Sequence, residues 1–134
     1  MTQIILNSAK CLLCGDVLIS RYQHYFVTCK CTTLSIDGGQ TYLRRLCYPM
    51  HSYEELSVNS DADYEEARQA VVRGSYGVTG KEPLHYIKLC DMTDSHLKAT
   101  IIYCKLHKQT ETIWYSYYLQ EVEYRKQHNI TIGE

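Results

Sequence analysis

Along residues 3–47, short apolar runs alternate with polar residues and are separated by turn residues, a pattern typical of β-strands. The glycines of Asp37-Gly38-Gly39 favour a hairpin turn, because glycine adopts the positive φ that such turns need. The strands expected around them cover residues 4–6, 17–20, 24–29, 32–36 and 41–47. The sequence therefore predicts an N-terminal β module at residues 1–50.

Residues 48–60 show no clear period, and a linker is expected at 51–60. The remaining portion, 61–134, is predicted to be mainly helical. Asp61 has the character of a helix N-cap, and Gly74 is the expected end of that first helix. A loop at 73–83 and a strand at 85–89 follow. The predicted fold class is thus α+β.

Two further helices are expected in this portion. One begins at Asp91 or Thr93 and buries Leu97, Ile101 and Cys104. The other runs from about 111 to 128, and its apolar face is predicted to hold Trp114, Tyr118, Val122 and Arg125.

Composition places the chain among ordinary globular proteins, with 134 residues, 45% hydrophobic and 22% charged. No apolar run reaches the roughly 20 residues that span a bilayer, and no secretory signal is recognised at the start. We therefore expect no membrane association and a cytoplasmic location. The formal net charge of −1 argues against broad non-specific binding to nucleic acid, which is usually driven by a basic surface.

Seven cysteines in a reducing compartment indicate metal binding or free thiols rather than disulfides. Four of them form two close pairs, Cys11-x-x-Cys14-Gly15 and Cys29-x-Cys31. In the first pair a tight turn brings two thiolates to one ion, and in the second, residues i and i+2 of a strand share a face. We expect all four cysteines to bind one zinc ion, with His24 as an alternative ligand and reduced core cysteines as the competing interpretation. Four thiolates leave no open coordination position, so this zinc would be structural.

The run from Lys10 to Arg45 resembles a small zinc-ribbon-like domain of unknown function found in tailed-phage proteins. The resemblance rests on C-x-x-C-G, H-x-F-V-x-C-x-C and D-G-G-x-x-Y-x-R-R, with Tyr25 departing from the Asp expected in that family. Later segments are similar to a second module of phage accessory proteins. The resemblance implies a viral origin and an early or host-interacting role, without an activity.

Three surfaces are candidates for binding a partner. Arg44 and Arg45 offer a basic site for nucleic acid, although adjacent strand residues point to opposite faces. An acidic stretch without basic residues offers a protein-binding surface or a solvated helix start; it consists of Glu54, Glu55, Asp61, Asp63, Glu65 and Glu66. Tyrosines of the last helix offer an interface or an aromatic core, and those expected to contact a partner are Tyr115, Tyr117 and Tyr124.

Together these patterns predict a non-enzymatic phage accessory protein that binds and inhibits a bacterial host protein, a component of antiviral defence such as a CRISPR system. One alternative is a zinc-ribbon module that binds nucleic acid. A second is a sponge for a signalling nucleotide, which would need a pocket lined by His, Tyr and Lys.

Overall fold

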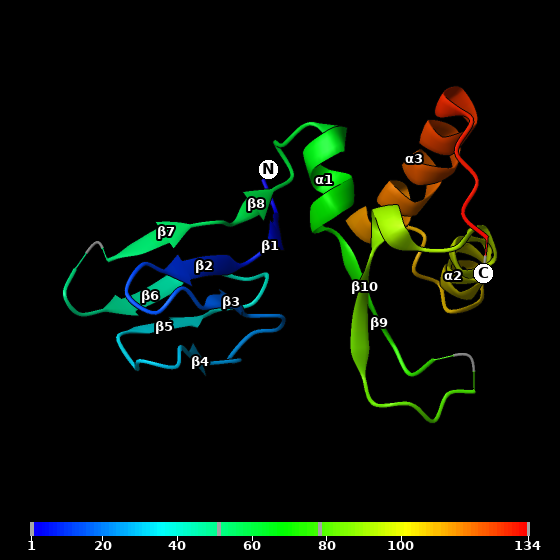
Figure 1. Cartoon of the computed structure of the whole chain (residues 1–134). Coiled ribbons are helices and arrows are strands. Elements are labelled where there is room, and N and C mark those ends of the chain that lie inside the picture. Colours follow the sequence, from blue (N-terminus) through cyan, green and yellow to red (C-terminus); the bar gives the residue numbers. More distant parts are fainter. Residues whose placement is uncertain (1, 51, 78, 134) are drawn as a thin grey trace. The chain divides into compact units, whose positions relative to one another are not determined.

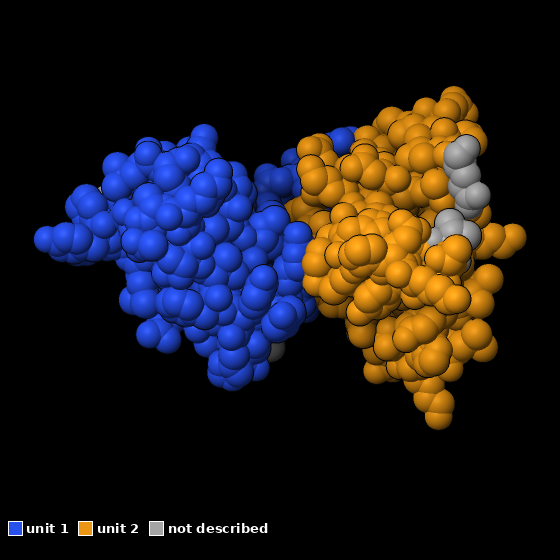
Figure 2. Space-filling model, turned by 60° about the horizontal axis from the view of Figure 1, so that its bottom comes forward, with its two compact units in different colours: residues 1–67 blue, residues 68–134 orange. Residues whose placement is uncertain are grey.

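The computed structural model describes residues 2–50, 52–77 and 79–133. Most strands lie in the N-terminal half and the long helices in the C-terminal part (Figure 1), so the predicted mixture of strands followed by helices is confirmed. The chain divides into two compact units, Met1–Ala67 and Arg68–Glu134 (Figure 2). The boundary falls inside helix α1, Tyr64–Ala70.

The first unit is built on antiparallel strands. The middle strand of one sheet is β2 (Ser8–Cys11), which pairs with β3 (Val17–Ile19) and with β7 (Tyr53–Glu55). A short two-stranded sheet continues from it, in which β1 (Ile4–Leu6) pairs with β8 (Val58–Asn59).

The middle strand of the other sheet is β5 (Leu34–Asp37), which pairs with β4 (Val27–Thr28) and β6 (Arg44–Cys47). In β5 the alternation of the sequence decides the burial, since Leu34 and Ile36 have no exposed surface. These two side chains meet residues of the first sheet in one buried cluster, which contains Ala9, Cys11, Leu18, Cys29, Leu34 and Ile36. Each large aliphatic side chain buried there contributes about 1.5–3 kcal/mol.

The linker predicted at 51–60 is wrong for the residues that form β7 and β8. Residue 51 itself lies outside the described residues. Tyr53-Glu54-Glu55 has no apolar alternation to mark a strand, but it pairs with Ala9-Lys10-Cys11 of β2, and the backbone N–H of Leu56 donates to the carbonyl of Ser8 over 3.0 Å. Pairing with a strand more than 40 positions earlier in the sequence therefore supplies the structure that the local pattern lacks.

The loop after β5 contains the Asp37-Gly38-Gly39 turn that the sequence predicted, and the hairpin is confirmed. Gly38 and Gly39 have positive φ of 112° and 52°, and a Cβ on Gly38 would collide with the backbone of Tyr42. The buried side chain of Asn7 donates from Nδ2 to the carbonyls of Asp37, Gly39 and Tyr42 at 3.1, 2.9 and 3.2 Å. Asn7 thus holds the Asp37-Gly38-Gly39 loop in place.

In the second unit a hairpin precedes two helices. Strand β9 (Val72–Ser75) pairs in register with β10 (His85–Lys88), so the loop predicted at 73–83 begins later than expected. Residue 78 of that loop lies outside the described residues. Helix α1 is capped by Asp63 rather than Asp61, because Asp63 Oδ1 accepts from the backbone N–H of Glu66 at 2.9 Å.

The two long helices begin at threonine caps. A short 3₁₀ turn (Leu89–Asp91) leads to α2 (Asp94–Leu106), which Thr93 caps, and α3 (Ile113–His128) follows with Thr112 as its cap. In α2 the buried residues are Leu97, Thr100 and Cys104, whereas the expected Ile101 is only half-buried. In α3 the buried residues are 117, 118, 121 and 125, so the buried face differs from the predicted one, which held 114, 118, 122 and 125.

Glu121 explains why the buried face of α3 differs from the predicted one. Its carboxylate is completely buried and accepts from two arginines, Arg68 at 2.7 Å and Arg125 at 2.8 Å. Arg125 also donates to Asp94 at 2.8 Å and to the carbonyl of Leu89 at 3.1 Å. The network joins α1, α2 and α3 within the second unit, and a hydrophobic-periodicity argument cannot find it because its members are charged.

Candidate metal centre

The first cysteine pair lies in a tight turn at the end of β2. The backbone N–H of Gly15 donates to the carbonyl of Cys11 at 2.8 Å, and the N–H of Cys11 donates to the carbonyl of Asp16 at 2.8 Å. Gly15 has φ of 81°, a conformation that L-residues rarely adopt. Gly15 therefore lets the chain reverse directly after Cys14, and we call this turn, residues 11–15, the knuckle.

The second pair converges through a turn rather than along a strand. β4 ends at Thr28, and the N–H of Thr32, whose φ is 63°, donates to the carbonyl of Cys29 at 3.0 Å. The sequence argument from i and i+2 of an extended strand is therefore wrong in its mechanism. Its outcome holds, because the turn places the Sγ atoms of Cys29 and Cys31 3.6 Å apart.

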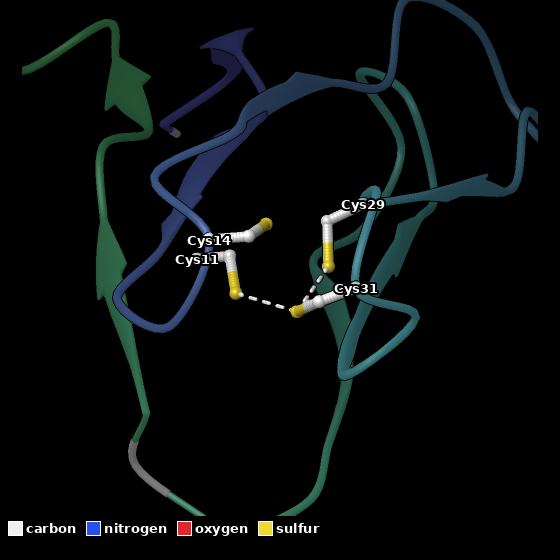
Figure 3. Close-up of side chains that lie close together, drawn as sticks. All are labelled: Cys11, Cys14, Cys29 and Cys31. Atoms are coloured by element: carbon white, nitrogen blue, oxygen red, sulfur yellow. Dashed lines mark hydrogen bonds between the residues drawn. The ribbon is translucent and has the colours of Figure 1, made fainter.

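All four sulfur atoms lie within 4.8 Å of one another (Figure 3). Cys11 and Cys31, from different pairs, are 3.6 Å apart. Tetrahedral zinc with Zn–S bonds of about 2.3 Å requires sulfurs separated by about 3.8 Å. The arrangement fits four-coordinate binding of a soft divalent metal, and it is the one group of this kind among the described residues.

Backbone and hydroxyl groups contact the sulfurs, and at Cys14 and Cys31 they favour the thiolate. The N–H of Leu34 donates to Cys29 Sγ at 3.3 Å, and Thr33 Oγ1 lies 3.2 Å from Cys31 Sγ. The hydroxyl and backbone N–H of Thr33 lower the pKa of Cys31 to about 6. Backbone N–H groups of Asp16 and Cys31 also lower the pKa of Cys14. These donors would hold the thiolates that a metal needs.

Cys11 shows the opposite tendency. The backbone N–H of Cys14 favours its thiolate, but burial and the neighbouring thiols of Cys31 and Cys14 outweigh this and raise the pKa of Cys11 to about 11. Cys11 has no exposed surface, and Cys29 is 3% exposed. A metal ion would supply the positive charge that makes ionisation of Cys11 favourable, so metal binding would release a proton here.

None of the seven cysteines forms a disulfide. The alternative ligand His24 is exposed and outside the sulfur cluster, and its φ of 68° places it in a turn. Cys47 is partly buried and packs against the buried cluster, with its Sγ 3.1 Å from Ser52 Oγ. Four of the five thiols in this unit thus form the cluster, and the fifth, that of Cys47, lies outside it.

The two arginines predicted for nucleic acid lie on opposite sides of β6, as expected. The side chain of Arg45 is buried, with 8% of its surface exposed. It donates to both carboxylate oxygens of Glu55 at 2.9 and 2.7 Å. Arg44 is exposed and 3.8 Å from Asp37. Lys30 likewise pairs with Asp16 at 3.4 Å. Each of these three basic side chains therefore lies beside a carboxylate.

The residues of the acidic stretch have different structural roles. Glu55 binds Arg45, and Asp63 caps α1, whereas Glu54, Asp61 and Glu66 are exposed. The stretch does not form one helix start, because Glu54 and Glu55 belong to strand β7.

The tyrosines of α3 also differ from the prediction. Tyr117 is 6% exposed, so its predicted role as a surface contact is wrong. Tyr124 stacks on His128 at 4.1 Å between ring centroids, and the guanidinium of Arg68 lies 4.3 Å from its ring. Tyr115 is half-buried. The aromatic-core alternative describes Tyr117 better than an interface does.

Comparison with known families gives one match. A domain of unknown function, DUF7695, matches residues 3–47. The match covers both cysteine pairs and the Asp37-Gly38-Gly39 loop, but only about a third of the chain. No curated protein and no solved structure matches this chain. No helix within the described residues is long and apolar enough to cross a membrane.

Proposed function

We propose that this chain is a non-enzymatic protein-binding protein whose β unit is held together by one structural zinc ion. The observation that carries the metal assignment is the convergence of Cys11, Cys14, Cys29 and Cys31, with all four sulfurs within 4.8 Å. Zinc is the ion proposed because soft thiolate ligands in a tetrahedral set select it over hard cations. Four protein ligands complete its coordination, so its role is to fix the surrounding loops.

The protein-binding assignment rests on apolar side chains that these loops expose. Leu12 and Leu13, between the first two cysteines, are 54% and 60% exposed. Tyr48 and Met50, on the loop after β6, are 86% and 74% exposed. The N–H of Leu12 donates to the carbonyl of Ser52 at 2.9 Å, which ties that loop to the knuckle. We call Leu12, Leu13, Tyr48 and Met50 the knuckle patch.

A patch of large apolar side chains is costly to leave in water and is typical of a protein interface. The metal site would keep it rigid, which lowers the entropy lost on binding. The knuckle patch therefore replaces Tyr117 and the neutralised Glu55 as the proposed contact surface.

The resemblance to tailed-phage proteins extends the proposal to the partner. It favours a bacterial host protein, a component of antiviral defence, that the chain binds and inhibits in the host cytoplasm. The nucleic-acid alternative is weaker, since Arg45 and Lys30 are engaged in ion pairs.

The test is affinity capture from a bacterial lysate with the zinc-loaded chain as bait. We expect the capture of one protein partner in stoichiometric amount. The double variant Leu12→Ser with Leu13→Ser should lose this capture at unchanged zinc content. Leu119→Ser is the matched control, because Leu119 is 42% exposed on α3, outside the knuckle patch. Recovery of no partner, or of the same partner by both variants, contradicts the proposal.

A further inference from the structure

A groove of about 660 Å³ lies in the second unit, between α2, α3 and the residues after α3. Its apolar lining consists of Leu97, Ile101, Ile102, Val122 and Ile130. The volume falls within the range of about 300–1,000 Å³ that binding clefts occupy. The groove uses no residue of the metal centre or of the knuckle patch.

Part of the apolar lining of the groove lies outside the core of the unit. Helix α2 turns Leu97, Thr100 and Cys104 into the core. Ile101 and Ile102 lie beside that face, and Ile102 remains 47% exposed. Helix α2 is therefore apolar over a wider arc than its packing against the rest of the unit requires. Such a surplus face is expected to be covered by a partner.

The rim of the groove is positively charged. Lys98, Lys105 and Lys126 line it and are exposed. Within the part of the chain that the structure describes, no ion pair engages Lys98 or Lys105, and Lys126 meets only the exposed Glu123 at 3.5 Å. The other charges of the wall, Arg125 and Asp94, bind each other at 2.8 Å. A carboxylate-bearing occupant would thus find unneutralised cations on the rim.

The lining also limits the chemistry of the occupant. Among the described residues that line it there is no aromatic ring and no histidine, so these residues offer no surface on which a nucleotide base would stack. Lys98 and Lys105 are seven residues apart on α2, about 10 Å along the helix axis. A single carboxylate cannot span that distance. The occupant needs an apolar stripe with several acidic groups spaced along it.

We propose that this groove binds an amphipathic helix of another protein, with an apolar stripe set against Ile101, Ile102 and Val122 and acidic residues set against Lys98 and Lys105. Helix-in-groove recognition of this kind reads anchors at i, i+3, i+4 and i+7. Acidic side chains seven residues apart on the bound helix match the spacing of the two lysines. The exposed rim charges would mainly accelerate association and make it salt-dependent.

The probe is a fluorescein-labelled designed peptide, two heptads or longer, with leucines on one face and glutamates flanking them. It is titrated with the full zinc-loaded chain and followed by fluorescence anisotropy. We expect saturable binding that weakens with salt. Lys98→Glu with Lys105→Glu should reduce the affinity by about tenfold or more, equivalent to about 1.4 kcal/mol. Lys81→Glu, which changes an exposed lysine outside the groove, should leave it unchanged.

Two controls keep the result specific. A peptide of the same composition in scrambled order should not bind, and Ile102→Asp should abolish binding of the designed peptide while the circular dichroism of the chain stays unchanged. Absence of saturable binding, or equal binding by the double lysine variant, overturns the proposal. So does direct binding of dodecanoate without peptide binding, which would indicate a small anionic amphiphile. A dimer in sedimentation that Ile102→Asp dissociates also overturns it.

Discussion

The Sγ atoms of Cys11 and Cys31 lie 3.6 Å apart although 20 positions separate the two residues in the sequence. One belongs to the turn at the end of β2 and the other to the turn between β4 and β5, so the contact joins the two three-stranded sheets of the first unit. Two thiolates at that distance repel each other unless a cation lies between them. A metal ion bound to both sulfurs would therefore stabilise the unit across this contact.

Thr33 is expected to tune the affinity of this centre for zinc. Its hydroxyl and backbone N–H lower the pKa of Cys31 to about 6. Thr33→Val removes the hydroxyl, raises the pKa of Cys31, and should weaken zinc binding by about tenfold or more, as loss of a supporting hydrogen bond does at other metal sites. Competition with a chromophoric chelator at neutral pH measures this.

Thr28→Val is the matched control. Thr28 Oγ1 contacts Ser35 Oγ at 2.8 Å and no sulfur, so this variant should keep the zinc affinity of the parent chain. Equal affinities for the two variants would show that the Thr33 hydroxyl does not act on the metal centre.

Arg45 is expected to stabilise the first unit, whereas Arg44 is not. Arg45→Ala removes two hydrogen bonds to Glu55 and should lower the free energy of unfolding by about 1 kcal/mol, a value reduced by screening because Glu55 is 42% exposed. Arg44→Ala changes an exposed side chain and should stay within about 0.5 kcal/mol. Urea unfolding at neutral pH compares the two.

The pH dependence of that difference follows from Glu55. Burial opposes its ionisation, but the hydrogen bonds from Arg45 and Ser57 outweigh burial and lower its pKa below 4.5. A group with a lowered folded pKa contributes stability above its unfolded pKa and loses it as pH falls through the folded pKa. The stability difference between parent and Arg45→Ala should therefore be full at pH 6 and shrink below about pH 4.5. A difference that grows on acidification would exclude this account of Glu55.

Glu121 is expected to be essential to the second unit. Its carboxylate is fully buried between Arg68 and Arg125. Glu121→Gln removes that negative charge from both guanidinium groups, and Arg125 keeps its ion pair with Asp94. Breaking a buried ion pair in this way costs about 3–5 kcal/mol. Glu123→Gln alters an exposed side chain and should cost less than about 0.5 kcal/mol. Thermal unfolding of the two variants should separate them clearly, and similar midpoints would mean that the network adds little.

Sequence reasoning succeeded where the determining interactions are local. The knuckle depends on Gly15 directly after Cys14, and the turn at Gly38 depends on two adjacent glycines, so short motifs contain the necessary information. The caps Thr93 and Thr112 are likewise local, although the sequence indicated only the approximate starts of these helices.

It failed where distant residues decide the structure. The strand at Tyr53–Glu55 forms because it pairs with β2. In the sequence its two glutamates are typical of a solvated segment, and only the structure shows that Glu55 forms an ion pair with Arg45. Arg68 and Glu121 are 53 positions apart, and nothing in either local sequence relates them. The buried face of α3 follows this ion network rather than apolar periodicity, and Tyr117 lies on that buried face.

The most direct test of the metal assignment is the zinc content of three purified chains, measured by mass spectrometry of the metal. The parent chain and Cys47→Ser should each hold about one zinc per chain, because Cys47 lies outside the sulfur cluster. Cys31→Ser should lose most of the metal and unfold at a lower temperature, since a structural zinc contributes folding free energy directly. Less than about half a zinc in the parent chain, together with an unchanged unfolding temperature in Cys31→Ser, would contradict a structural zinc centre.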